Sequence, residues 1–226
     1  MILELSHKHY SQSAVFAGQE EFMKIQKVLL AIRHTKKGGV SETNPSDQLS
    51  DSYIGTTGRA CIQAIELPYD IKQQRIDLFG SGVCRTHQEL TALILVNELD
   101  GEAHDPLLNM GNDTMFNAWM AAGLKDAVKE TGSNIRGLEK VLGPEAFKQA
   151  CEACADDIRK AISVMTYDYS LGVFHTPTIE MAAHALSMDY PATLAEDKGI
   201  VFVLYEDGSV SAYGTWSSGD PIPEVE

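Results

Sequence analysis

The chain has 226 residues, 44% of them hydrophobic and 22% charged, so it is long enough to bury a core without disulfide or metal support. The 32 acidic and 18 basic residues give a net charge of −14, which argues against direct phosphate contacts to nucleic acid and against an anionic membrane as partner. There is no stretch of ~20 apolar residues and no signal-peptide pattern at the N-terminus. We therefore expect one cytoplasmic domain over residues 1–226 with its four cysteines reduced.

The first third of the chain predicts a short strand, several helices and one long loop. Residues 2–5 read as the strand. A helix is expected over 20–33 from apolar residues spaced as on one helix face: Phe22, Ile25, Val28, Leu29 and Ile32. Residues 34–57 are polar and rich in glycine and serine, which predicts a mobile loop. Further helices are expected over 58–67, which Pro68 ends, and over 69–79.

The strongest apolar signal lies in the middle of the chain. Residues 90–96 are apolar on nearly all sides of a helix, which predicts a buried central helix over about 83–99. This helix is expected to form the core around which the other elements pack.

The second half predicts more helices and a final β-hairpin. Helices are expected over 112–130, 133–142, 144–163 and from Thr176 to before Pro191, with a strand over 167–174. Asp207-Gly208 lies between two apolar runs, which predicts a hairpin over about 199–214, followed by a loose tail over 217–226. The expected fold class is therefore α+β and predominantly helical, with a small antiparallel sheet.

One candidate catalytic group is Cys84. The segment Gly80-Ser81-Gly82-Val83-Cys84 places a thiol in the first turn of the central helix, where the helix dipole stabilises a thiolate. This segment resembles the Gly-x-Cys helix start of the papain-like and transglutaminase-like thiol enzymes. The resemblance implies a histidine partner, for which His175 is the best candidate, and an orienting acid such as Asp189. The alternative is that Cys84 is a buried structural cysteine.

Two further patterns suggest metal chemistry. Cys84-x-x-His87 and Cys151-x-x-Cys154 together could supply four zinc ligands, although buried cysteines at helical spacing equally fit a core. His104-Asp105 resembles the metal-binding doublet of the HD phosphohydrolases, which implies a metal-dependent phosphohydrolase. A polar loop with a turn-forming aspartate is the alternative.

No catalytic constellation is complete in the sequence. The preferred hypothesis is therefore an acidic regulatory protein that binds a protein partner, such as a basic one, with no cofactor. A Cys84 thiol enzyme and a phosphohydrolase around His104-Asp105 are the two alternatives. The sequence does not determine the oligomeric state.

Overall fold

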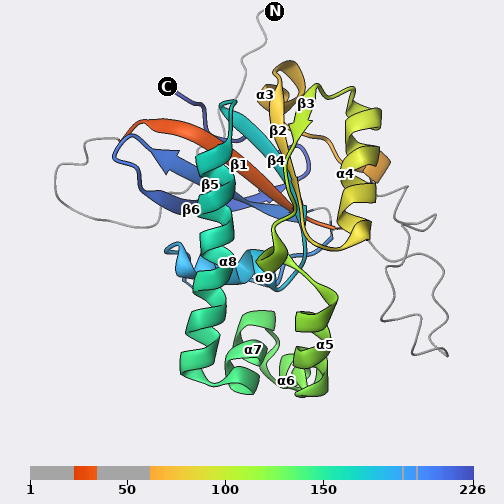
Figure 1. The fold of residues 1–226 in the computed structure, drawn as a ribbon, viewed down its shortest axis with the longest axis vertical. Coiled ribbons are helices and arrows are strands. Elements are labelled where there is room, and N and C mark those ends of the chain that lie inside the picture. The colour runs from red at the N-terminus through yellow and green to blue at the C-terminus, as the bar shows by residue number, and fades with distance from the viewer. Residues whose placement is uncertain (1–22, 35–61, 190, 197) are drawn as a thin grey trace, which may run out of the picture.

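The computed structural model of the protein describes residues 23–34, 62–189, 191–196 and 198–226. Within these residues, six strands form one mixed sheet in the order β3-β2-β4-β1-β5-β6 (Figure 1). The strands are β1 (Ile25–Arg33), β2 (Ile76–Gly80), β3 (Gly101–Ala103), β4 (Tyr169–Phe174), β5 (Lys198–Tyr205) and β6 (Val210–Ser217). The first four are parallel to one another, while β5 and β6 add an antiparallel hairpin beside β1.

Helices cover both faces of this sheet, so the architecture has three layers. The helices are α3 (Tyr69–Gln73), α4 (Cys84–Asn97), α5 (Asp113–Ala121), α6 (Leu124–Thr131), α7 (Asn134–Leu142), α8 (Pro144–Val164) and α9 (Thr178–Ala185), with the 3-10 helix η1 (Leu108–Met110). The α3 and α4 helices pack on one face, and α8 and α9 on the other. The short α5, α6 and α7 gather at the end of α8 that lies away from the sheet (Figure 1).

The predicted fold class, predominantly helical with a small antiparallel sheet, is therefore wrong. The error begins at β1, where a helix was expected over 20–33. Residues 28–32 are all completely buried, with alternate side chains entering the two separate cores on either face of the sheet. A strand covered on both faces is a continuous apolar run, and such a run also fits helical spacing when it is short. A further helix expected over 69–79 is divided between α3 and β2.

The central helix exists as α4, but it is not central. Leu93 is completely buried against the sheet, whereas Leu95 and Val96 are 73% and 47% exposed. The helix therefore covers one face of the sheet and leaves its other side to solvent. The buried centre of the molecule is formed by the strands instead.

The C-terminal hairpin is confirmed as β5 and β6, joined by a turn over residues 206–209. The tail that follows is not loose. The indole N–H of Trp216 donates to the Asp220 carbonyl at 2.9 Å, and Ile222 is buried in the core under α4. The backbone N–H of Glu226 donates to Ile25, so the tail is held along β1.

In the second half of the chain, most predicted helices are found. A single helix expected over 112–130 is divided into α5 and α6 at Gly123, whose φ of +93° ends the first helix. Asn112 caps α5, and Ser133 caps α7. The expected strand over 2–5 and most of the expected loop over 34–57 lie outside the described residues. No helix among the described residues is long and apolar enough to cross a membrane.

The two sides of α4 give a direct test of this packing. Leu93→Asp should lower the free energy of unfolding by ~3–5 kcal/mol, because it places an unpaired charge in the core. Leu95→Asp on the exposed side of the same helix should change it by less than about 1 kcal/mol. Urea unfolding of both variants measures the difference. Equal losses would show that both faces of α4 are buried.

Candidate functional site

Three parallel strands end together at one edge of the sheet. β4 lies between β1 and β2, and in the register of the sheet Arg33 of β1 pairs with Phe174 while Gly80 of β2 pairs with Val173. The residues that follow these strand ends must therefore lie close together. In open α/β sheets this carboxyl edge is where ligands bind.

The residues that follow β1 and β4 are both histidines. The backbone N–H of His34 donates to the carbonyl of Phe174 at 3.0 Å, which continues the ladder one residue beyond β1. His175 is the next residue after Phe174. The two imidazole rings lie with their centroids 4.4 Å apart and are tilted by 56°. Residues 141 positions apart in the chain thus form a histidine pair.

The third strand end contributes an arginine through helix α4. Ser81 follows β2, and its hydroxyl oxygen accepts from the backbone N–H of Val83 at 3.3 Å. Thr86 donates its hydroxyl to the Val83 carbonyl at 2.8 Å and accepts from the Ser81 N–H at 3.2 Å. These bonds join the turn after β2 to the first turn of α4. They fix the start of α4 and thereby the place of Arg85 in its first turn.

Arg85 joins the two histidines. Its side chain is only 6% exposed, and Nη2 lies 3.1 Å from His175 Nδ1 and 3.4 Å from His34 Nε2. A guanidinium group only donates hydrogen bonds, so the two ring nitrogens that face it present lone pairs. When neutral, His175 therefore carries its proton on Nε2, and His34 carries its proton on Nδ1.

His175 is held more tightly than His34. It is 2% exposed, and the Phe116 ring of α5 meets it edge-on at 5.1 Å. Thr178 donates its hydroxyl to the carbonyl of His175 at 2.7 Å. His34 is only partly buried. The pair thus consists of one fixed imidazole and one that is more accessible.

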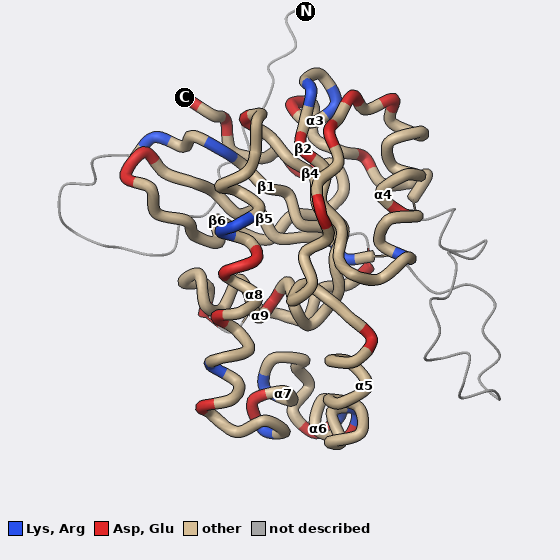
Figure 2. The backbone as a smooth tube through the Cα atoms, in the orientation of Figure 1, with Lys and Arg blue, Asp and Glu red and all other residues tan. Residues whose placement is uncertain are grey.

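Two arginines lie at this edge of an acidic protein. Acidic residues are spread over strands, loops and helices, and Lys and Arg are fewer (Figure 2). Arg85 contacts both imidazoles, and Arg33 directly precedes His34. A guanidinium group with two imidazoles suits a tetrahedral oxyanion, because all three groups can donate to its oxygens when protonated.

Of the predicted catalytic residues, the structure places only His175 in this cluster. Cys84 is exposed at the start of α4, where Gln88 Nε2 lies 3.6 Å from its sulfur. Asp189 is exposed beyond the C-terminal end of α9, the helix that begins three residues after His175. His34 and Arg85 were missed. Their signals were a histidine directly after the apolar run of β1 and an arginine in the first turn of a helix that follows a strand.

The predicted zinc ligands lie on opposite faces of the sheet. Cys84 and His87 are on α4, while Cys151 and Cys154 are buried in the core under α8. His87 Nε2 contacts the Ser81 carbonyl at 2.8 Å. Burial raises the pKa of Cys151 to about 12 and that of Cys154 even further above its usual value. Among the described residues, no cluster of His, Cys, Asp and Glu could hold a metal ion.

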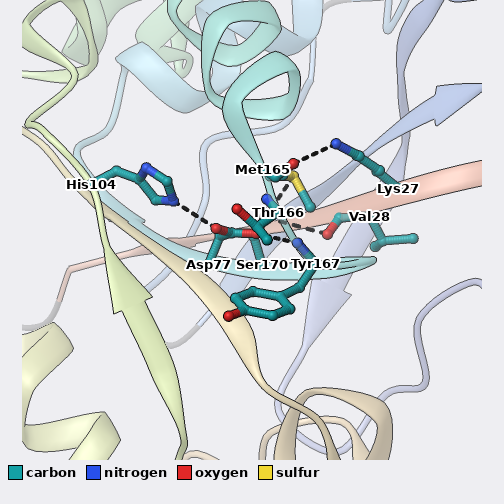
Figure 3. Close-up of polar contacts among 8 residues, drawn as sticks. All are labelled: Lys27, Val28, Asp77, His104, Met165, Thr166, Tyr167 and Ser170. Carbon is teal, nitrogen blue, oxygen red and sulfur yellow. Dashed lines mark hydrogen bonds and ion pairs between the residues drawn. The ribbon is translucent and has the colours of Figure 1, made fainter.

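The His104-Asp105 doublet has a structural partner instead (Figure 3). His104 Nε2 lies 2.6 Å from Oδ1 of Asp77, a completely buried carboxylate of β2. The other oxygen of Asp77 accepts from the backbone N–H groups of Thr166 and Tyr167 at 2.9 and 2.8 Å. The ring of His104 also stacks on Phe79 at 4.7 Å. These contacts join the end of the edge strand β3 to the start of β4 through Asp77. His104 therefore has a structural role here, in contrast to the metal-binding role that the sequence suggested.

The comparisons with known proteins identify the fold. No protein-family model matches the sequence, and a search of curated proteins finds no similar sequence. Solved structures do match. A phosphoglycerate mutase from Bacillus anthracis is 17% identical with a TM-score of 0.54, covering 87% of this chain and 95% of the mutase.

Two phosphatases match over similar lengths. A phosphoserine phosphatase from Entamoeba histolytica is 13% identical with a TM-score of 0.52, over 85% of this chain and 98% of its own. The protein histidine phosphatase SixA, solved with tungstate, is 12% identical with a TM-score of 0.51, over 84% of this chain and 97% of its own. The chain therefore has the α/β fold that these mutase and phosphatase structures share.

Two glycines offer a matched test of how His175 is held. A Cβ added to Gly111 would lie 2.4 Å from His175 Cδ2, whereas one added to Gly123 meets nothing within 4 Å. Both residues have positive φ, so both alanine variants introduce backbone strain. Gly111→Ala should lower the free energy of unfolding by about 1–3 kcal/mol more than Gly123→Ala, because it overpacks the ring. It should also shift the NMR signals of the His175 imidazole. Equal losses and an unmoved imidazole would show that His175 is not held against Gly111.

Proposed function

We propose that this protein is a phosphatase that transfers a phosphoryl group from a phosphate monoester to His34 and then to water. The observation that carries the proposal is the contact of one buried guanidinium group, Arg85, with ring nitrogens of two histidines. Phosphoryl transfer depends mainly on positioning and on stabilising the charge of the phosphoryl oxygens. A fixed arginine with an imidazole on either side can position the phosphoryl group and stabilise its charge.

The accessibility of the two rings favours His34 as the acceptor of the phosphoryl group. A nucleophilic nitrogen needs a lone pair directed at the phosphorus atom and room for the group that it accepts. The lone pair of His34 Nε2 points toward the Arg85 guanidinium group, which would bind the phosphoryl oxygens. His34 is also only partly buried. His175 is wedged among Phe116, Gly111 and Thr178, so we assign it the binding of phosphoryl oxygens.

The reaction then has two balanced steps. The lone pair of His34 Nε2 attacks phosphorus, the P–O bond to the leaving group breaks, and the leaving oxygen takes a proton from solvent. A water molecule then attacks the phosphohistidine, the P–N bond breaks, and the attacking water returns a proton to solvent. Orthophosphate leaves and the imidazole is restored. Arg85 binds the phosphoryl oxygens in both steps, since a guanidinium group can donate two parallel hydrogen bonds to them.

The fold supports a phosphatase over the earlier hypotheses. The matching structures include phosphatases that are named for phosphoserine and for protein histidine, and one of them holds tungstate. They conflict with a non-catalytic regulator and with a cysteine nucleophile, the two readings that the sequence had favoured. They also lead away from a metal-dependent phosphohydrolase at His104, since that histidine is bound to Asp77.

Steady-state hydrolysis of p-nitrophenyl phosphate tests the assignment. His34→Ala should lower kcat by at least about a thousandfold, because it removes the acceptor of the phosphoryl group. Arg85→Ala should lower kcat/KM by about a hundred- to a thousandfold, because the developing charge loses its donor. Arg85→Lys should recover part of this loss, since an ammonium group keeps the charge but not the paired donors.

Two variants outside the site serve as controls. Arg159→Ala removes a half-buried arginine of α8, and His184→Ala removes a histidine that packs against Phe147. Both should keep kcat within a few-fold of the unmodified protein. The proposal fails if His34→Ala keeps the normal rate, or if Arg159→Ala costs as much as Arg85→Ala.

A further inference from the structure

A fully buried carboxylate lies behind the histidine pair. Glu180, in the first turn of α9, is 0% exposed, and its Oε1 accepts from the backbone N–H of Leu194 at 3.0 Å. Asn134 of α7 hydrogen-bonds to the same carboxyl group. Burial raises the pKa of Glu180 to about 7, although the bond from Leu194 and the charge of Arg33 both act to lower it. The proposed reaction does not use this group directly.

The backbone of Leu194 connects Glu180 to Arg33, the residue before His34. Leu194 accepts a hydrogen bond from Arg33 Nη1 through its carbonyl and donates to Glu180 through its N–H. Arg33 is the last residue of β1, so its side chain is anchored immediately before His34. The carbonyl and the N–H of Leu194 thus bridge Arg33 and Glu180.

The two residues before Glu180 are bonded to the second histidine. The backbone N–H of Ile179 donates to the His175 carbonyl at 3.1 Å, and Thr178 bonds to the same carbonyl. Glu180 follows directly on this turn. The carboxylate therefore links the segment after β4, which carries His175, to the segment after β1, which carries His34.

The charges around Glu180 are few. Arg33 of β1 is the cation that acts on it, and His184 lies one turn further along α9. The elements that pack against α9 are α8, β5, β6 and η1, and their buried residues include no charged side chain. The titratable groups among them, Cys151 and Cys154, stay neutral because burial raises their pKa. Attraction between Glu180 and Arg33 is therefore poorly screened by other charges.

We propose that ionised Glu180 is a positioning residue for the histidine pair: through Leu194 and Arg33 it holds His34 in line with His175 and Arg85. This inference rests on the proposed phosphatase function and assigns regulation by pH to the same site. When Glu180 takes up a proton, Arg33 loses its counter-charge, and the arginine side chain that anchors the end of β1 is held less firmly.

Stability and activity should then respond to pH in opposite directions. The folded protein binds the Glu180 proton more tightly than the unfolded chain, because the pKa in the fold lies near 7, above its ordinary value of 4.5. The contribution of Glu180 to stability therefore falls as pH rises from about 4.5 to about 7. The contribution of Glu180 to the alignment of His34 rises as the carboxyl group ionises near pH 7. A residue with only a structural role would change stability and activity in the same direction.

The test compares Glu180→Gln with the unmodified protein over pH 5.5 to 8.5, where the variant keeps the shape of the neutral acid. At high pH the variant should melt several degrees higher and turn over p-nitrophenyl phosphate roughly tenfold more slowly. At the lowest pH the two rates should converge. The ratio of the two rates removes every effect of pH that the two proteins share. Glu206→Gln, in the exposed turn of the hairpin, should match the unmodified protein throughout.

Two results would overturn the proposal. One is a rate ratio that does not change with pH, whether it equals one or not, and the other is a Glu180→Gln protein that is less stable or unfolded at high pH. If the unmodified protein has no turnover at all, the phosphatase proposal fails on its own. Calorimetric titration with inorganic phosphate then replaces turnover, and the ratio of affinities should show the same loss at high pH and the same convergence at low pH.

Discussion

The parallel pairing of β1 with β4 is the constraint on which the site depends. Its register places Arg33 opposite Phe174, so that the two strands end together and each is followed by a histidine. A shift of one residue would turn one histidine to the opposite face of the sheet, since side chains alternate along a strand. The bond from the His34 N–H to Phe174 secures this register at the point where it matters most. The burial of residues 28–32 on both faces secures it along the strand.

The surrounding elements fix the direction of the side chains that leave this edge. The bonds between Ser81 and Thr86 set the first turn of α4, and with it Arg85. Phe116 and Gly111 confine His175, while His34 keeps space beside it. On the far face of the sheet, Arg33 and Glu180 share the Leu194 backbone. A buried cation on one face and a buried carboxylate on the other thus support one histidine pair, and each is costly to bury without its partners.

The sequence predicted local structure better than it predicted the fold. The helices over 133–142 and 144–163 were found from their caps and from proline at the first helical position, and the hairpin was found from Asp207-Gly208, because these signals are local. The sheet depends on pairings between β1, β2 and β4, which are far apart in the chain. Residues 25–33 carry an apolar pattern that suits a helix or a buried strand, and only the neighbouring strands decide between them.

The site was only partly predictable for the same reason. His175 was noticed because it stands where a strand meets a helix, but it was paired with Cys84 rather than with His34. Arg85 adjoins Cys84 in the sequence, and only the geometry shows which of the two turns toward the histidines. Glu180 was not singled out in the sequence. Its burial and its bond to Leu194 arise from packing between α9 and the segment 191–196, which leaves no local pattern.

The central claim is that His34 carries the phosphoryl group during the reaction. The most direct measurement is to mix the protein with a 32P-labelled phosphate monoester, quench within the first turnover under alkaline conditions that preserve phosphohistidine, and map the label by mass spectrometry of peptides. We expect the label on His34, and we expect far less label on the same peptide of the Arg85→Ala variant, in which the transfer is slowed. A label on His175 or Cys84, or turnover with no covalent label at any time, would contradict the account.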